Sequence, residues 1–600
     1  MSRAWEYSHG AVRQADGRFR FRLWAPDVEA VTLHLEGVRI PMNRLDGGWF
    51  ETQYACTEGA SYCYEPAGLG RRVPDPASRL QRDDVDGPSI VVDHSKYQWA
   101  HADWLGRPWT ETVLYEAHVG LLGGFRGVQQ HLPRLAEFGI TALELMPIAD
   151  FPGPRNWGYD GVLPYAPDRA YGTPEELKEL IDTAHGLGLM VFLDVVYNHF
   201  GPIGNYLPGY ASSFFREDVR TPWGAAIDFR QAPVRSFFAD NALYWLKEYR
   251  FDGLRFDAVH AIVEKDAWLQ ELALRLREAA PPQRCIHLVL ENDDNTASLL
   301  RHGFDAQWND DAHHVVHHLL TGETRGYYSA YAQRPTEKLA RALAQGFIYQ
   351  GEPSPAHGDK PRGEPSYMLH PTAFVFFLQN HDQVGNRACG ERLAQLCADT
   401  PDALRAAVAL QLLSPAIPLI FMGEELGAQS PFLYFTSFED EAFAEKVRQG
   451  RRAEFQDFHR ETGLEIPDPN APSSWLDSHL PPADTSWSQG WLAFYKNLLE
   501  LRRRHVTPGL RDATCESVDV LARGCLIACW ELADLQRLTI YCNLSGEPVE
   551  APPGIRHASE TIFYESSPGA TIALQSGRLP PHCTVASLMP IPETPEVRKT

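Results

Sequence analysis

Acidic residues stand at the ends of several short apolar segments of this 600-residue chain. Asp194 ends the segment LMVFLD, Asp257 follows GLRF, Glu291 follows HLVL, and Asp382 comes soon after FVFFLQ. One carboxylate in such a place most often caps a helix or forms a turn. Several that converge on one open face raise each other's pKa, which suits acid and base chemistry. The pattern therefore predicts an active site built from carboxylates.

Two of these acids have different surroundings in the sequence. Arg255 and Asp257 are two residues apart on an expected strand, so both side chains point the same way and the guanidinium can keep Asp257 ionised. An ionised carboxylate is what a nucleophile requires. Glu291 follows an apolar strand and has no Arg or Lys before Arg301, which makes it the better candidate for a protonated acid. Glycoside hydrolysis requires at least two such groups, one ionised as the nucleophile and one protonated as the acid.

Eight apolar segments must position these residues. They alternate with stretches of helical periodicity, and TPEELKELIDTAHGLGL is typical, with a Thr-Pro-Glu start and Gly near its end. Eight strands alternating with helices predict a (β/α)8 TIM barrel, whose active site lies at the C-terminal ends of the strands. The expected strands are 113–119, 142–148, 189–196, 253–259, 287–291, 305–309, 374–379 and 418–423.

The rest of the chain has the pattern of β-domains. Short alternating runs between Phe19 and Asp93 predict an N-terminal β-sandwich over residues 1–105, and a return of short strands after about Thr507 predicts a C-terminal β-sandwich over 501–600. We expect a multidomain α/β protein in which the barrel, residues 106–500, is flanked by these two all-β domains. Loop insertions near 197–235 and 321–372 either build a binding cleft or are disordered.

Composition excludes several classes of function. The 55 Lys and Arg residues against 78 Asp and Glu give a net charge of −23, so the surface should repel phosphate backbones and anionic lipids. We expect no nucleic-acid and no membrane partner. The chain has no apolar stretch of 18 residues and no apolar leader near Met1, which predicts a cytoplasmic protein. Ten scattered cysteines without a CxxC pair indicate neither a disulfide framework nor a structural zinc site.

Four segments carry a resemblance to a known family. DVVYNH (194–199), GLRFDAVHA (253–261), LVLEN (288–292) and FLQNHD (377–382) are similar, in order and spacing, to the four signature segments of the α-amylase family of glycoside hydrolases. The resemblance covers roughly residues 110–500. It implies that Asp257 is the nucleophile, Glu291 the acid/base, and Asp382 the carboxylate that grips sugar hydroxyls in the transition state. We expect no cofactor. Some members of the family hold calcium through the Asn that corresponds to Asn198, but the other ligands cannot be identified in this sequence, so we expect no required metal.

The same resemblance implies a set of substrate-binding residues. Arg255, His199 and His381 would form hydrogen bonds around the cleaved sugar, Asp194 and Asn198 would support the site, and Tyr159 would stack under the sugar ring. Trp157, Trp223 and Trp308 lie on expected cleft loops or strand ends, where they either stack on sugars or belong to the core. His313, His314, His317 and His318 suggest a metal site by spacing, but sugar contacts or simple packing explain them better.

Further segments narrow the substrate class. MPIADFPGPRNWGYDGVLPYAP and WNDDAHHVVHH, together with extended forms of the four signature segments, resemble enzymes that cleave the α-1,4 bond next to the terminal trehalose unit of maltooligosyltrehalose. The implied partner is such an α-glucan oligosaccharide. Common α-amylases carry Lys-His three and four residues after the nucleophile, where this chain has His260 and Ala261, so a differently shaped leaving group is favoured.

Alternatives stay open at this point. The acidic run 292–295 either supplies acceptors for sugar hydroxyls or caps the next helix. A glycogen or starch branching enzyme and a plain α-amylase fit the same motifs. A catalytically inactive binding subunit fits the barrel but not the complete set of three carboxylates.

Overall fold

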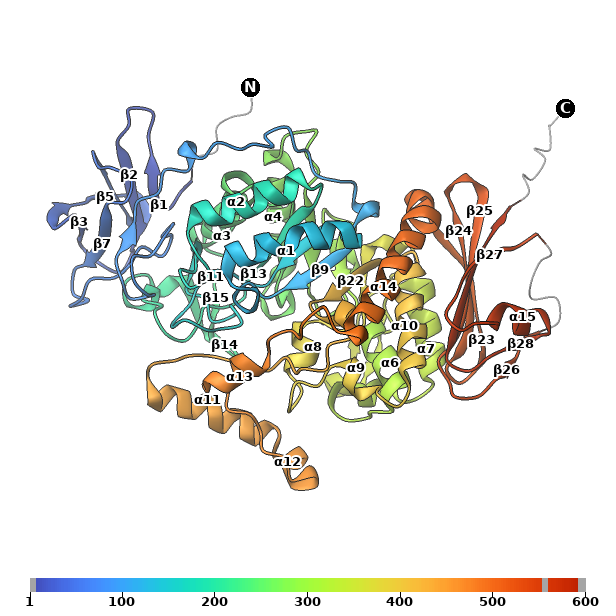
Figure 1. Ribbon diagram of the computed structural model, residues 1–600. Helices are drawn as coiled ribbons and strands as arrows, with labels where there is room; N and C mark the ends of the chain where they lie inside the picture. Colours follow the sequence, from blue (N-terminus) through green and yellow to red (C-terminus); the bar gives the residue numbers. More distant parts are fainter. Residues whose placement is uncertain (1–6, 553–558, 592–600) are drawn as a thin grey trace.

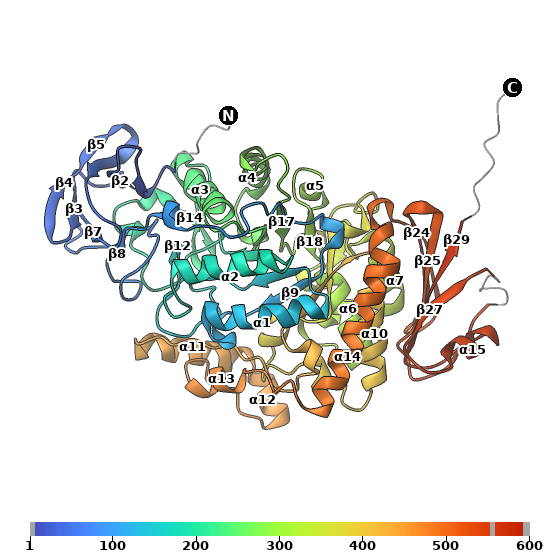
Figure 2. The ribbon, with the colours of Figure 1, turned by 45° about the horizontal axis from the view of Figure 1, so that its top comes forward.

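Three parts follow one another along the chain in the computed structural model, which describes residues 7–552 and 559–591. A β-domain at the N-terminal end and another at the C-terminal end lie on opposite sides of a central barrel surrounded by helices (Figures 1 and 2). The fold class predicted from the sequence is confirmed.

The N-terminal domain is a sandwich of two antiparallel four-stranded sheets. In β7, the buried residues Tyr62, Tyr64 and Pro66 alternate with partly exposed ones, so one face of this strand is apolar. Phe21 of one sheet meets Tyr62 of the other edge to face, with ring centroids 5.1 Å apart. The first sheet has the order β1 (Gly10–Arg13), β2 (Phe19–Trp24), β6 (Trp49–Tyr54), β5 (Asn43–Leu45), and the second β4 (Val38–Pro41), β3 (Val31–Leu35), β7 (Ser61–Pro66), β8 (Ser89–Ile90).

Eight parallel strands close into the barrel. Seven lie within their predicted segments, and β22 begins one residue before the segment 418–423. The first residue of β16 is Gly253. A larger residue does not fit there, because its Cβ would lie 2.5 Å from the ring of Phe192 on the neighbouring strand. In order around the barrel the strands are β9 (Leu114–Ala117), β10 (Ala142–Leu145), β13 (Met190–Val195), β16 (Gly253–Phe256), β17 (His287–Leu290), β18 (Ala306–Trp308), β21 (Phe374–Phe377) and β22 (Ile417–Phe421).

Helices cover the outside of the barrel. The predicted start of α2 is a capping box, in which the Thr173 side chain accepts from the backbone of Glu176 and the Glu176 side chain accepts from that of Thr173. The helices from α1 to α10, with α14, are α1 (Gly124–Phe138), α2 (Pro174–Gly186), α3 (Ala232–Glu248), α4 (Lys265–Ala279), α5 (Ala297–Leu300), α6 (Asp310–Thr321), α7 (Pro335–Gln345), α8 (His381–Gly385), α9 (Leu393–Leu396), α10 (Pro401–Leu413) and α14 (Ser486–Leu501).

Both predicted insertions are structured. Residues 197–235 contain a hairpin, β14 (Phe215–Thr221) and β15 (Gly224–Ile227), and residues 321–372 contain α7 and the hairpin of β19 (Glu352–Ser354) and β20 (Lys360–Arg362). Two short strands, β11 (Ala149–Asp150) and β12 (Leu163–Pro167), pair in the loop after β10. A third excursion, which the sequence analysis missed, follows β22 and holds α11 (Glu441–Glu454), α12 (Gln456–Thr462) and α13 (Pro472–Asp477). In Figure 1, α11 and α12 extend away from the barrel.

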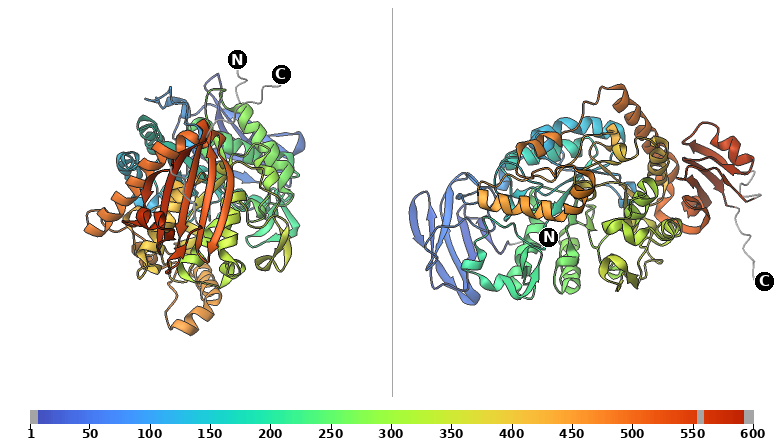
Figure 3. Two further views of the ribbon diagram at one scale, coloured as in Figure 1. Left: turned by 90° about the vertical axis from the view of Figure 1, so that its right-hand side faces the viewer. Right: turned by 90° about the horizontal axis from the view of Figure 1, so that it is seen from below.

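The C-terminal domain is a five-stranded antiparallel sheet with apolar residues on both faces (Figure 3, left). One face, with Trp530 and Ile540, belongs to the same apolar core as the barrel helices, and α7 and α10 lie against it. The other face, with Ile527 and Tyr541, is covered by α15 (Ala570–Gln575) and a two-stranded sheet of β26 (Val549–Glu550) and β28 (Arg578–Leu579). The large sheet has the order β23 (Thr514–Ala522), β24 (Cys525–Leu532), β25 (Gln536–Asn543), β29 (Cys583–Pro590), β27 (Thr561–Glu565).

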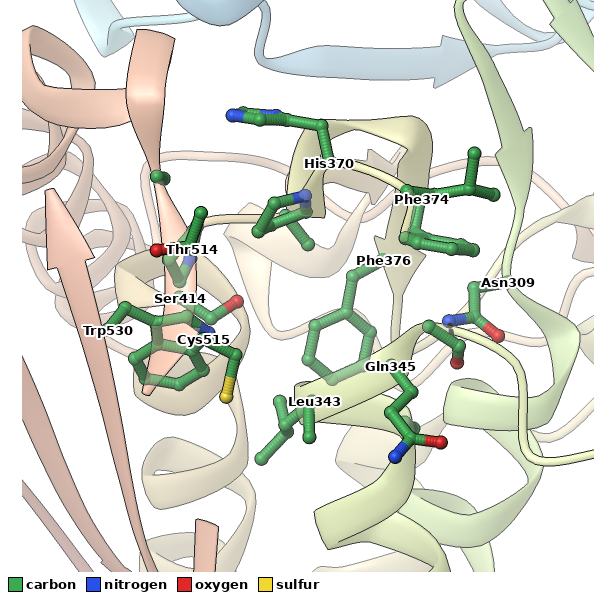
Figure 4. A pocket seen from close by; sticks show the side chains of 18 of the residues that line it. Asn309, Leu343, Gln345, His370, Phe374, Phe376, Ser414, Thr514, Cys515 and Trp530 are labelled. Atoms are coloured by element: carbon green, nitrogen blue, oxygen red, sulfur yellow. Dashed lines mark hydrogen bonds between the residues drawn. The ribbon is translucent and has the colours of Figure 1, made fainter. Parts of the chain in front are cut away.

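Packing between the barrel and this sheet is incomplete at one place. A cavity of about 350 Å³ lies there, with Cys515 and Trp530 of the sheet on one side and Phe374 and Phe376 of β21 on the other (Figure 4).

The ten cysteines are free thiols, and Cys525 is buried while Cys529 is partly buried. Within residues 7–552 and 559–591, no helix has both the length and the apolar character that crossing a bilayer requires.

Arg502 ties α14 to the barrel just before the C-terminal sheet. Its side chain is 1% exposed and donates hydrogen bonds to the carbonyl oxygens of Leu412, Ser414 and Ala416, at 2.6–2.9 Å. Burial lowers the pKa of Arg502 to about 9. These carbonyls end α10 and lead into β22, so one side chain satisfies three backbone groups between two barrel elements.

We expect Arg502→Met to destabilise the protein by about 3 kcal/mol, because three buried carbonyl groups lose their donor. The measurement is the melting temperature followed by circular dichroism. Arg503→Met is the matched control, since Arg503 is exposed on the next position of the same helix. Equal melting temperatures for the two variants would contradict this role of Arg502.

Candidate active site

Arg255 lies at the centre of the site, inside the barrel and 2% exposed. Its Nη1 is 2.6 Å from Oδ2 of Asp194 and 2.8 Å from Oδ1 of Asp257. Asp194 and Arg255 are register partners on the paired strands β13 and β16, so the sheet itself sets the first contact. The guanidinium also lies over the ring of Trp308, 4.3 Å from its centroid. One buried cation thus binds two carboxylates from adjacent strands.

Asp257 follows β16 directly and is held on both oxygens. Besides the contact with Arg255, its Oδ2 accepts a hydrogen bond of 2.8 Å from Nδ2 of Asn198. The next residue, Ala258, has a left-handed backbone with φ of 41° and donates its N–H to Oε2 of Glu291 at 2.6 Å. A carboxylate fixed in this way by donors is suited to act as a nucleophile.

Glu291 follows β17, and burial raises its pKa. His260 and Arg255 oppose this increase, and Asp257 and Asp382 add to it. Nη2 of Arg255 lies 3.8 Å from Glu291, so the sequence-based expectation that Glu291 has no cation beside it is wrong. The cation comes from the neighbouring strand, which spacing along the sequence does not reveal. The raised pKa still fits a group that donates a proton.

Asp382 lies in the first turn of α8, after β21, and is exposed. Its Oδ1 accepts a hydrogen bond of 2.6 Å from Nδ2 of Asn386. Asp382, Glu291, Arg255 and His260 border one cleft of about 950 Å³, whose far walls are loop 322–328 and residues of α12. The barrel therefore brings the three predicted carboxylates together at one open face.

His381 depends on a residue that the sequence analysis missed. Its Nδ1 is 2.5 Å from Oε1 of Glu116 on β9, and its backbone N–H donates to Oε2 at 3.0 Å. Burial alone lowers the pKa of His381, but Glu116 reverses this and raises it. The available signal was an acidic residue inside the apolar segment VLYEAHV. Glu144 on β10 is the register partner of Glu116 and is equally buried. Burial raises the pKa of Glu144 well above the usual range.

The remaining predicted residues of the loops after β10 and β13 also meet here. The Tyr159 hydroxyl donates to Oδ2 of Asp194 at 2.6 Å, and its ring stacks on His381 with centroids 5.0 Å apart. His199 contacts Oδ1 of Asn198 through Nδ1 and the Tyr159 carbonyl through Nε2 at 2.9 Å. Trp223, on the hairpin of the first insertion, stacks on His199 at 4.5 Å and is 48% exposed.

Two tryptophans differ from the expectation that they bind substrate. Trp157 is 5% exposed, stacks on Phe432 and donates to the Leu433 carbonyl, so it packs behind His381 and outside the cleft lining. Its assignment as a sugar-stacking surface is wrong. Trp308 lines the cleft but is 1% exposed, and Arg255 covers its ring. Both indoles support the polar residues instead of offering a free face.

The acidic run after Glu291 is mostly structural. Asn292 and Asn295 are buried, and Nε2 of Gln307 donates hydrogen bonds to the carbonyl oxygen of Asn292 and to Oδ1 of Asn295. Asp294 forms an ion pair with Lys265 at 2.5 Å. Helix α5 begins at Ala297 without a side-chain cap, so the capping alternative does not hold. Asp293 alone of the four lines the cleft, where His357 and Arg362 of the second insertion bind it at 2.7 and 2.9 Å. No cluster of His, Cys, Asp or Glu that could hold a metal ion occurs in the described residues.

Comparison with known proteins identifies the family of the chain. A sequence model described as the α-amylase catalytic domain matches residues 92–214, and a domain of unknown function, DUF3459, matches residues 515–586. The malto-oligosyltrehalose trehalohydrolase of Deinococcus radiodurans is 40% identical over 494 residues, which cover 81% of this chain and 81% of that protein. The chain belongs to the malto-oligosyltrehalose trehalohydrolase family. It is therefore a glycosidase of the α-amylase type.

Two further comparisons place the chain within α-amylase relatives. A crystal structure from Salmonella typhimurium, described provisionally as an α-amylase, is 42% identical, has a TM-score of 0.91 and matches 98% of this chain and 100% of that one. The 1,4-α-glucan branching enzyme of Vibrio cholerae is 34% identical, but only over 41% of this chain and 38% of its own length. The likeness to branching enzymes is thus partial, whereas the likeness to the trehalohydrolase family extends over most of the chain.

The raised pKa of Glu291 predicts how activity depends on pH. We expect kcat/KM to fall as the pH rises through this pKa, because the leaving oxygen needs the Glu291 proton. Glu291→Gln should lower kcat/KM on an oligosaccharide by about 10²- to 10⁴-fold. It should affect the first step with α-maltosyl fluoride much less, since fluoride leaves without protonation. Equal losses on both substrates would contradict the assignment of Glu291 as the acid.

Proposed function

We propose that this protein hydrolyses the α-1,4-glucosidic bond next to the terminal trehalose unit of maltooligosyltrehalose and releases trehalose. The observation that carries the proposal is the complete set of three carboxylates around Arg255, in a chain whose trehalohydrolase relative matches over 81% of its length. The substrate is then an α-glucan oligosaccharide with a trehalose end. Such a reaction supplies free trehalose from α-glucan.

The chemistry is a retaining double displacement. Asp257 attacks the anomeric carbon while Glu291 donates its proton to the leaving oxygen, so that trehalose departs and a glycosyl ester forms on Asp257. Glu291, now ionised, removes a proton from the incoming water, whose oxygen attacks the same carbon and frees Asp257. Asp382 holds hydroxyls of the reacting sugar, and Arg255 keeps Asp257 in place throughout.

Several residues support sugar binding around this reaction. His381, Tyr159 and His199 are stacked or hydrogen-bonded to one another beside the carboxylates, and Asn198 and Asp194 fix Asp257 and Arg255. The replacement of a Lys-His pair by His260 and Ala261 favours a leaving group other than a maltooligosaccharide. A branching enzyme or a plain α-amylase are the alternatives.

The cellular setting is also a proposal. Ten free thiols fit a reducing compartment, and we infer a cytoplasmic enzyme. The net charge of −23 supports the absence of a nucleic-acid partner.

Product analysis tests the proposed function. We expect purified protein to release free trehalose from maltotriosyltrehalose, and to cleave a reducing maltooligosaccharide of equal length much more slowly. Chromatography of both reaction mixtures gives the two rates. Equal rates would indicate an α-amylase, and a change in the iodine staining of amylose without new reducing ends would indicate a branching enzyme.

A further inference from the structure

Two side chains near the start of α6 line the cleft but have no role in the mechanism. Helix α6 begins at Asp310, directly after β18, and Asn309 caps it by accepting a hydrogen bond from the Ala312 N–H at 3.2 Å. Asp310 and His314 are four residues apart and so lie on one face of the helix. Both line the cleft that holds Glu291 and Asp382. The fixed start of α6 therefore presents a polar pair to the reaction site.

Asp310 has an oxygen free for a ligand. Its Oδ1 accepts from Nε2 of Gln383 at 3.3 Å, and within the described residues Oδ2 has no hydrogen-bond partner. Burial raises the pKa of Asp310 well above the usual range, and Glu291, Asp293 and Asp382 raise it further. All four carboxyls line the same cleft, which also holds the acid that must stand next to the leaving oxygen.

His314 is an unpartnered polar side chain. It is 6% exposed, and neither ring nitrogen has a hydrogen-bond partner among the residues that the structure describes. Burial lowers the pKa of His314 to about 4, so the ring is neutral near pH 7 and offers one donor and one acceptor. Leaving such atoms unpaired costs free energy, which a bound hydroxyl would offset.

Tyr327 of the second insertion stacks on His314. Its ring lies nearly parallel to that of His314, with centroids 5.6 Å apart, and the residue is 63% exposed. It also lines the cleft. A carboxyl, a neutral imidazole and an exposed aromatic ring are together the kind of surface that binds a pyranose, through hydroxyl hydrogen bonds and a ring face.

We propose that Asp310 and His314 bind hydroxyls of the leaving disaccharide and thereby select a trehalose end over a maltose end. In trehalose the outer glucose is joined through its anomeric carbon and has a free 4-hydroxyl. In maltose the reducing glucose is joined through its 4-oxygen and has a free anomeric hydroxyl instead. Glu291 meets the inner ring, which the two leaving groups share, so the outer ring lies farther along the cleft that Asp310, His314 and Tyr327 also line. The inference rests on the proposed function, since it names the residues that read the substrate of that same site.

The test uses Asp310→Ala and His314→Phe, the second of which keeps an aromatic ring under Tyr327 but removes both nitrogens. The ratio of kcat/KM for maltotriosyltrehalose to kcat/KM for the reducing maltooligosaccharide should fall by about tenfold in each variant, the worth of one lost hydroxyl contact. The inhibition constant of trehalose should rise by a similar factor. Circular dichroism checks that each variant is folded, and the two variants test the subsite independently.

Asp457→Ala is the matched control, because Asp457 lines the same cleft on α12 and its side chain is 81% exposed. This variant should keep the wild-type ratio. Variants of Asp310 and His314 that lose activity on both substrates in equal proportion, or that keep the wild-type ratio, would overturn the subsite while the proposed function stands. A wild-type protein without any preference for the trehalose end would overturn both.

Discussion

The buried guanidinium of Arg255 is the interaction on which the site depends. A charge that is 2% exposed must be paired, and Arg255 pairs with Asp194 and Asp257 at the same nitrogen. Removing one partner of such a group typically costs about 3–5 kcal/mol, because the remaining charges stay buried. The register of β13 and β16 fixes this cation, and the cation in turn fixes the nucleophile. The position of Asp257 is therefore determined by the sheet and not by a flexible loop.

A second buried pair balances the first. Glu116 on β9 binds His381, the first residue of α8, so that the two partners again come from distant parts of the chain. Tyr159 links the two pairs, since it stacks on His381 and donates to Asp194. Tryptophan rings fill the space behind these polar groups and exclude water from them. Interactions between charges are stronger in such surroundings than in water.

Much of this arrangement could be predicted from the sequence. The eight apolar segments predict the barrel, and the spacing of Arg255 and Asp257 predicts that their side chains meet. Contacts between distant parts of the chain could not be predicted. Glu116 lies 265 residues from His381 and was hidden within an apolar strand. The cation beside Glu291 comes from another strand, and the burial of Trp157 depends on Phe432 in the loop after β22. Periodicity gives the elements and their faces, but closure of the barrel decides which faces meet.

The anomeric configuration in which the maltooligosaccharide is released tests the central claim most directly. If Asp257 is the nucleophile that Arg255 holds in place, a glycosyl ester forms and is then hydrolysed, so the released maltooligosaccharide begins as the α-anomer. Proton NMR during the first minutes of a reaction at high enzyme concentration distinguishes this anomer before it equilibrates. Initial formation of the β-anomer would mean that water attacks directly, and would contradict the role assigned to Asp257.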